Sequence, residues 1–537
     1  MISVKSVALT LLLASFCCLP SAFADEGNGV GSAYVEHTPA RIGGVIQIDF
    51  GSPGLAGAQA LFIISDGLGL TTFPGIGPIC LDVFSPAARI AVDTFLDANG
   101  NASRTVGIPN MPSLSTFDPI YALSLVVDFT QPTFFSLSKT VAIYFENGDG
   151  YMATGVMGEA RSLHTATAFN GSDRDQNVKV FVAGGGAGNV LGPTASDTTE
   201  IYSPLTRSFS AGPAMSVVRV FHQSVRLDDG RILVTGGFDN MGAGHDNCEI
   251  FDPASGVFSA TGALNTGRGA HLATKLPNGN VLVTGGLPSF AGGLGTSMLA
   301  ALLNQTLDTA EVYDVVTGTW SATANNMSAP RFGHAQVLLG NGDVLVTGGI
   351  DGAVTIPFAG VDVPTFTATC DLYVSATNSF VATASLPQAV AAHGLSVLGN
   401  GDVLATGGLV SLSLFLPPGM TADCNAFDGV NWNSTAPLAT PVALHTQVSA
   451  DGNGDALVHG GIAGSLLAPV PVDAAGRHDG TAFSSLGLIG LDPGVPAQPS
   501  FLISTHTMTR VYEGSYLMLG GADASVALDT GYVYLEG

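Results

Sequence analysis

The segment Val344-Leu345-Val346-Thr347-Gly348-Gly349 decides the fold of this 537-residue chain. A short apolar run ends in two glycines, and His334 precedes the first of them by 14 residues. The first glycine of such a pair stands at positions 184, 236, 285, 348, 407, 460 and 520, at intervals of 49 to 63 residues. A histidine precedes every pair: His164, His222, His271, His334, His393, His445 and His506. Seven copies at this spacing indicate a repeat architecture.

Each copy is predicted to be four short antiparallel strands. The first strand begins at the histidine and ends at a tight turn such as Asp229-Gly230, a dipeptide that favours two-residue hairpins. The strand with the double glycine follows, then a loop of variable length, a third strand such as 249–252 and an outer strand such as 257–261. The two glycines allow the chain to turn sharply where neighbouring units crowd a central axis.

The repeat resembles that of the kelch family. The residues that carry the resemblance are Arg331-Phe332-Gly333-His334, the strand 344–349, the acidic-aromatic strand Glu311-Val312-Tyr313-Asp314 and Trp320 in the outer strand. The resemblance covers about residues 148–537 and implies a seven-bladed β-propeller, although blade six departs from it with His478 at an aromatic position.

The last unit supplies only three strands, of which 531–535 is the third. Residues 150–155, followed by Arg161 and His164, align with 256–261, followed by Arg268 and His271. We therefore expect about residues 149–156 to be the outer strand of blade seven, which would remove the open edge of the ring.

Residues 25–147 lack the repeat and are predicted to form a small antiparallel β-sandwich. Alternating apolar runs lie at 45–50, 60–64, 90–95, 121–129 and 140–145. Asp97, Asn99 and Asn101 resemble the start of a calcium loop, but no glutamate stands at the twelfth position, so a plain turn is favoured.

Residues 1–24 have the features of a secretory signal peptide. Lys5 supplies the positive charge, residues 7–16 form the apolar run, and Ala22-Phe23-Ala24 is a cleavage site. Cleavage after Ala24 predicts a secreted or periplasmic protein, and no later segment is typical of a membrane span.

Charge narrows the range of partners. With 17 Lys and Arg against 42 Asp and Glu, the net charge of −25 repels nucleic acid and anionic lipid. We expect a monomer that binds neither nucleic acid nor membranes.

The cysteines of the repeat are predicted to be free. Cys248, Cys370 and Cys424 occupy one small packing position of the third strand in different blades, and equivalent positions lie too far apart for a disulfide. Cys80 is then unpaired as well.

Neither a metal site nor a catalytic site is expected. The seven histidines form a ring instead of converging, and the resemblance implies that each bonds backbone of a neighbouring strand. Some kelch-type propellers are copper-radical oxidases of the galactose-oxidase type, but this chain has no Tyr-His dipeptide and no domain after the propeller. Tyr202, Tyr313 and Tyr373 fall in third strands as core residues. No nucleophile or Walker motif is present, so no cofactor is predicted.

Four arginines are the candidate ligand-binding residues. Each lies three residues before a repeat histidine: Arg161, Arg219, Arg268 and Arg331. Such an arc could hold a carboxylate ligand through charge-assisted bonds. The alternative, which we favour, is that each arginine pins its loop to the neighbouring blade.

The loops after the double glycines differ most between blades. Residues 287–308, 350–369 and 409–422 form the longest of them, all apolar and all on one face, which we call the loop face. Long loops on a rigid scaffold are the usual place of recognition, although they could instead cap the channel. The sequence thus predicts an exported, non-enzymatic protein whose loop face binds a protein or glycan. The alternative is a carbohydrate-active or galactose-oxidase-like oxidoreductase on the same fold.

Overall fold

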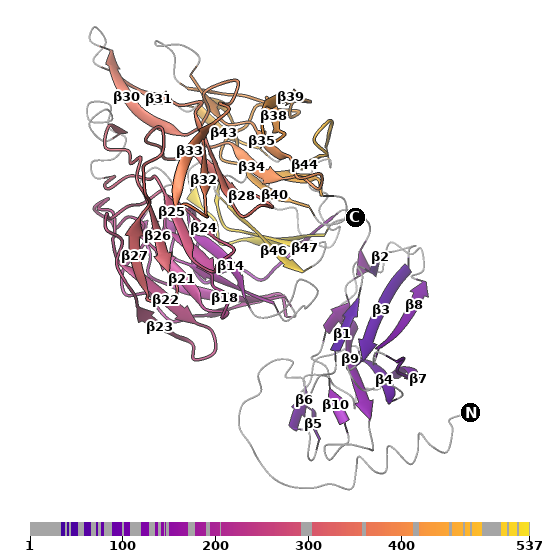
Figure 1. Ribbon diagram of the computed structural model, residues 1–537. Helices are drawn as coiled ribbons and strands as arrows, with labels where there is room; N and C mark the ends of the chain where they lie inside the picture. Colours follow the sequence, from indigo (N-terminus) through magenta and orange to yellow (C-terminus); the bar gives the residue numbers. More distant parts are fainter. Residues whose placement is uncertain are drawn as a thin grey trace, which may run out of the picture.

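The computed structural model is all-β, and its main body is a ring of small antiparallel sheets (Figure 1). It describes residues 150–535 except 170–177, 189–193, 205, 291–302, 357–360, 412–417, 451–453, 466–467, 473–474, 486–505, 513–514 and 524–525. Before residue 150 it describes 34–37, 40–41, 45–51, 58–65, 71–73, 77–79, 89–98, 101–107, 120–127, 135–137, 141–143 and 145–146. The predicted signal peptide and Cys80 lie outside these ranges.

Seven four-stranded sheets form the blades of a propeller, as the repeat predicts. Blades one to three are β14 (Thr165–Phe169), β15 (Lys179–Ala183), β18 (Thr199–Ser203), β19 (Ser208–Ala211); β20 (Gln223–Arg226), β21 (Ile232–Thr235), β22 (Cys248–Asp252), β23 (Val257–Ala260); and β24 (Leu272–Lys275), β25 (Val281–Thr284), β26 (Ala310–Asp314), β27 (Thr319–Ala322). Blades four and five are β28 (Ala335–Leu338), β29 (Val344–Thr347), β32 (Cys370–Val374), β33 (Ser379–Thr383); and β34 (Gly394–Val397), β35 (Val403–Thr406), β38 (Cys424–Phe427), β39 (Trp432–Thr435). Blades six and seven are β40 (Thr446–Ser449), β41 (Ala456–His459), β44 (Ala475–His478), β45 (Phe483–Ser485); and β46 (Thr507–Tyr512), β47 (Ser515–Leu519), β50 (Gly531–Leu535), β13 (Gly150–Ala153).

The ring closes through strands from opposite ends of the repeat region. β13 pairs antiparallel with β50, in a register that sets Gly150 opposite Leu535 and Tyr151 opposite Tyr534. This is the outer strand that the alignment with the other blades predicts. The first strands of consecutive blades contact one another all the way round, including β46 with β14. The ring of blades is therefore continuous.

The core lies between blades, because each second strand is covered on both faces. All four residues of β21, β25, β29, β35 and β41 are buried, which explains why these strands are continuously apolar. Residues of adjacent blades share one cluster: Leu282 and Val312 of blade three pack with Val344, Val346 and Tyr373 of blade four. Burial between blades, more than within them, stabilises the ring.

The double glycines end the second strands in a conformation that other residues avoid. Gly285 and Gly286 have φ of 59° and 94°. A Cβ on Gly285 would lie 2.2 Å from the carbonyl oxygen of Arg331, which belongs to the next loop. The glycines thus permit the close approach of successive blades.

Several loops after the double glycines contain strands of their own, which the sequence analysis does not predict. They are β16 (Gly186–Ala187) with β17 (Thr194–Ala195), β30 (Ile350–Ile356) with β31 (Val361–Phe366), and β48 (Ala522–Asp523) with β49 (Val526–Ala527). A further sheet joins β36 (Leu409–Val410) and β37 (Gly419–Met420) of blade five to β42 (Ile462–Ser465) and β43 (Ala468–Pro471) of blade six. In Figure 1 the β30–β31 hairpin extends outward from the ring.

The N-terminal region contains short strands close to the predicted positions. One sheet has the order β1 (Tyr34–His37), β3 (Val45–Gly51), β8 (Asn101–Gly107), and another the order β10 (Phe135–Leu137), β9 (Ile120–Val127), β4 (Gln59–Ser65), β7 (Arg89–Phe95), with β11 (Val141–Ile143) also paired to β9. The remaining pairs are β2 (Ala40–Arg41) with β12 (Phe145–Glu146) and β5 (Thr71–Phe73) with β6 (Gly77–Ile79). At the end of β7, the carboxylate of Asp97 accepts a hydrogen bond from the amide of Asn101, 2.9 Å away.

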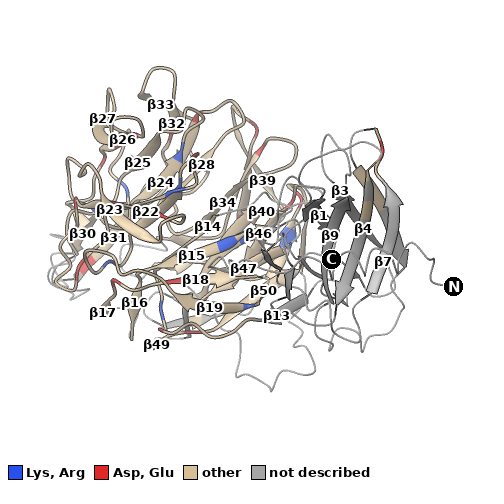
Figure 2. Cartoon of the chain, turned by 90° about the horizontal axis from the view of Figure 1, so that it is seen from below, with Lys and Arg blue, Asp and Glu red and all other residues tan. Residues whose placement is uncertain are grey.

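Charged side chains are sparse over the described part of the ring (Figure 2). Within the same part of the chain, no helix is long and apolar enough to cross a membrane.

Candidate functional site: the loop face

The repeat histidines join neighbouring blades at the loop face. Each Nε2 lies 2.8–3.1 Å from a threonine hydroxyl of the preceding blade. The pairs are His164–Thr507, His222–Thr165, His271–Thr235, His334–Thr284, His393–Thr347, His445–Thr406 and His506–Thr446. The resemblance implied backbone partners on a neighbouring strand, whereas the partner in the structure is a threonine side chain. Each threonine is the first residue of a first strand or the last residue of a second strand. This position lies beside the next histidine and needs a short polar side chain.

Burial makes these histidines weak bases. Desolvation lowers the pKa of His164 and His271 to about 3, with the adjacent Arg161 and Arg268 adding to the effect. It also lowers the pKa of His445 to about 4. The rings are therefore neutral at physiological pH and act as hydrogen-bonding wedges between blades.

Blade six has a variation at this position that the sequence analysis missed. His459 stands where blades two to five have threonine, and its Nδ1 lies 3.1 Å from Nε2 of His506. His478, at the aromatic position of the third strand, is fully buried with Nε2 2.8 Å from the carbonyl oxygen of Ala436. Both histidines thus form part of the packing of blade six.

The four predicted arginines are buried, with 0 or 1% of their surface exposed. Each guanidinium pairs at 2.5–2.8 Å with a carboxylate of the blade that follows the arginine in the chain: Arg161–Glu200, Arg219–Glu249, Arg268–Glu311 and Arg331–Asp371. The Nη1 atom of each also donates to two carbonyl groups, which for Arg331 are those of Gly348 at 2.9 Å and Thr369 at 3.0 Å. The carboxylates in turn accept hydrogen bonds from the loop that leads into the blade, as Asp371 does from the amide of Ser328.

The backbone of each arginine belongs to the preceding blade, which gives the residue its structural role. The amide of Arg331 donates to Leu307, and its carbonyl accepts from Gly286, both in blade three. Its guanidinium meanwhile binds blade four. These are the contacts expected if each arginine pins its loop to the neighbouring blade. A carboxylate ligand would have to compete with a carboxylate already held by the same nitrogen.

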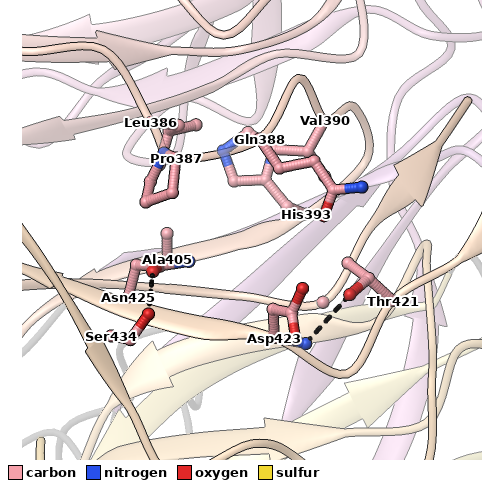
Figure 3. Close-up of a pocket in the computed structure, with 11 residues that line it drawn as sticks. Leu386, Pro387, Gln388, Val390, His393, Ala405, Thr421, Asp423, Asn425 and Ser434 are labelled. Atoms are coloured by element: carbon pink, nitrogen blue, oxygen red, sulfur yellow. Dashed lines mark hydrogen bonds between the residues drawn. The ribbon is translucent and has the colours of Figure 1, made fainter.

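Blade five lacks this ion pair and has a pocket in its place (Figure 3). Val390 occupies the arginine position, and Asn425 occupies the position of the paired carboxylate. The pocket has a volume of about 180 Å³ and opens to solvent beside the exposed carboxylate of Asp423. The sequence alone does not reveal this cavity, which follows from removing a guanidinium while the surrounding backbone stays the same.

The residues immediately before the histidines form a collar around the mouth of the channel. They share a left-handed backbone, with φ of 52–58°: Leu163, Phe221, Ala270, Gly333, Ala392 and Leu444. Backbone hydrogen bonds join successive members, such as Ala270 N to Phe221 O at 2.9 Å and Leu444 N to Ala392 O at 3.0 Å. The collar is mostly apolar, and over blades one to three Phe221 packs with Phe238 and Phe290.

The described residues contain no group of three or more His, Cys, Asp or Glu side chains that could hold a metal ion. Two of the third-strand tyrosines have structural partners. Tyr313 OH lies 2.6 Å from the Thr261 hydroxyl, and Tyr373 OH donates to the side-chain oxygen of Asn378. Both tyrosines are core residues, as their repeat position predicts.

Cys248, Cys370 and Cys424 are free and buried, as predicted. Burial raises the pKa of their thiols to about 12, 11 and 12 respectively. We expect none of the three to react with an aromatic disulfide reagent at pH 8 in the native protein, because the thiolate is the reactive form. All three should react in guanidinium chloride. Thiol titration of the mature Cys80→Ser variant measures the number of reactive thiols in the native and in the denatured protein. Rapid reaction of even one thiol before denaturation would contradict the assignment of these cysteines as buried thiols.

The sequence matches no protein-family profile and no curated protein sequence. Among solved structures, one described as "Structure of YjhT" is similar with a TM-score of 0.45 and 14% sequence identity. The match covers 62% of this chain and 99% of that one.

Proposed function

We propose that the protein is an exported binding protein, without enzymatic activity, whose loop face binds a protein or glycan. A propeller is a general scaffold for binding and interaction. The observation that carries the proposal is the additional secondary structure on this one face, namely the β30–β31 hairpin and the sheet shared by the loops of blades five and six. Elements that project from a rigid ring are suited to contact a partner.

Exposed apolar side chains occur on this face. Val354 on β30, Val470 on β43 and Met241 in the loop of blade two have 48%, 56% and 83% of their surface exposed. Leu444 of the collar is also exposed. Apolar groups on projecting loops gain free energy when a partner covers them.

The polar groups of the ring favour binding over catalysis. The repeat histidines are engaged with threonines and the four arginines with carboxylates, so both sets serve to join blades. The oxidoreductase alternative would require titratable groups that converge on a substrate instead. The predicted signal peptide and the acidic composition favour export of a monomer.

Shortening the β30–β31 hairpin tests the proposal. We expect a variant with residues 354–363 replaced by Asn-Gly to lose binding, by at least tenfold in affinity, to the ligand found with a glycan array and affinity capture. The matched control is replacement of Pro277-Asn278-Gly279, the turn between β24 and β25 on the opposite face, which should leave affinity unchanged. Equal binding by both variants, or peroxide release from sugars or alcohols by the purified protein, would contradict the proposal.

A further inference from the structure

We infer that the pocket of blade five is a binding site for the guanidinium group of an arginine side chain from a partner polypeptide. The inference rests on the proposed function, since it names the chemistry that the loop face recognises. It comes from comparing blade five with blade four, where the corresponding space is filled by the guanidinium of Arg331.

The backbone around the pocket is the same in both blades. The amide of Gly407 donates to Asp423 O at 3.0 Å, as Gly348 donates to Thr369 O at 3.2 Å. The amide of Asp423 donates to the Thr421 hydroxyl at 3.1 Å, and the amide of Thr369 donates to that of Thr367 at the same distance. The loop residue is also fixed in the same way, because Val390 O accepts from Gly349 at 2.8 Å and Arg331 O from Gly286 at 2.9 Å. Only the side chains differ.

The groups that receive a guanidinium in blade four have counterparts in blade five. Arg331 donates to the carbonyls of Gly348 and Thr369, to the Thr369 hydroxyl and to the Asp371 carboxylate. The corresponding residues Gly407, Asp423 and Asn425 all line the pocket. Two carbonyl positions are thus retained, the threonine hydroxyl becomes a carboxylate, and the aspartate becomes an amide whose oxygen accepts from Ser434 at 3.2 Å (Figure 3).

Size and charge fit a planar cation. A cavity of about 15 Å³ already holds one water molecule, so 180 Å³ leaves room for a guanidinium with part of its alkyl stem. Leu386, Pro387 and Val390 line the pocket and offer apolar contact to that stem. Asp423 supplies the negative charge, and the acidic chain, with a net charge of −25, attracts cations from solution. His393, the other titratable group that lines the pocket, is held neutral by burial and does not repel a cation.

An arginine ligand is favoured over lysine by the arrangement of acceptors. In blades one to four the receiving groups engage two nitrogens of one planar fork, a geometry that a single ammonium cannot reproduce. An arginine from outside would therefore make in blade five contacts that correspond to those that blades one to four make internally.

Calorimetry on the mature full-length protein with N-acetyl-arginine amide tests the inference. We expect saturable one-site binding, and at least tenfold weaker binding of the neutral isostere N-acetyl-citrulline amide and of N-acetyl-lysine amide. Asp423→Asn should weaken arginine binding about tenfold, while the matched control Asp402→Asn, in the β34–β35 turn of the same blade, should leave it unchanged. Agmatine carries the same guanidinium group without a peptide backbone. If agmatine binds tenfold more tightly than N-acetyl-arginine amide, the proposal of a polypeptide ligand is overturned.

The decisive variant fills the pocket from within. Val390→Arg with Asn425→Asp recreates the pair of blade four, and we expect it to abolish probe binding while the melting temperature stays the same or rises. Retained binding in this variant, or equal binding of arginine and citrulline probes, would overturn the inference. If the arginine probe fails while shortening the hairpin still abolishes ligand binding, the inference falls and the proposed function stands. If the arginine probe binds but shortening the hairpin leaves ligand binding unchanged, the pocket of blade five stands as a guanidinium site and the proposed function falls.

Discussion

Replacing Glu311 with alanine is expected to lower the free energy of unfolding by about 3–5 kcal/mol, because it leaves the buried charge of Arg268 without a partner. Arg268 is fully buried and lies 2.7 Å from Glu311. The same carboxylate also accepts hydrogen bonds from the amides of Asn265 and Thr266, so the substitution releases the incoming loop as well. Urea unfolding followed by tryptophan fluorescence measures the loss.

The chain itself offers the matched control for this substitution. Arg268→Val with Glu311→Asn copies the residues that blade five has at the same positions, Val390 and Asn425. Removing both charges avoids an unpaired buried ion, so we expect the double variant to be more stable than Glu311→Ala alone by about 2 kcal/mol. A double variant as unstable as the single one would show that the cost comes from lost packing and not from the uncompensated charge.

Mild acid is expected to destabilise the propeller strongly through its buried histidines. Their pKa values, about 3 for His164, His271 and His393 and about 4 for His445 and His459, lie below the ordinary value of 6.5. The unfolded chain therefore takes up protons first as the pH falls. The stabilisation is complete above pH 6.5 and is lost progressively toward the folded-state values. Each histidine loses about 2 kcal/mol between pH 6.5 and 5, and together these losses reach the order of 10 kcal/mol, comparable to the stability of a typical protein.

Melting curves at a fixed scan rate measure this effect. We expect the melting temperature to fall by at least about 10 °C between pH 7.5 and 5.0. His271→Asn keeps a hydrogen-bonding side chain opposite Thr235 but removes one titrating group, so the stability of this variant should depend less steeply on pH than that of the unaltered protein. A melting temperature that stays constant down to pH 5.0 would refute the assignment of these histidines as neutral wedges between blades.

The ring itself could be predicted because its determinants are local and repeated. A double glycine is required wherever successive blades crowd together, and the histidine recurs because each blade needs the same wedge. Closure by β13 was predictable too, since residues 150–155 carry the pattern of an outer strand without a preceding third strand. Such features can be recognised in the sequence because each of the seven blades has the same physical requirement at the same position.

Other features depended on contacts between residues far apart in sequence. The threonine partners of the histidines lie 36 to 60 residues away, or 343 in the case of His164 and Thr507, and threonine is too common in strands to stand out. The sheet between the loops of blades five and six rests on one cross-loop pairing, Gly419 with Ser465, which no local pattern marks. The pocket of blade five could not be predicted without the positions of the atoms that surround Arg331. Only with those positions does Val390 indicate a space that a guanidinium could fill.

The pairing of β13 with β50 also sets the order of events during folding. A chain made from its N-terminus produces β13 early and its partner last, 385 residues later, as the separation of Gly150 from Leu535 shows. Bringing the two ends together costs conformational entropy, because the pairing joins residues that are far apart in the chain. Until then β13 remains an unpaired edge, able to pair with the wrong chain. Closure is thus expected to be a late and slow step, and the interval before it is when the nascent protein most needs protection by a chaperone.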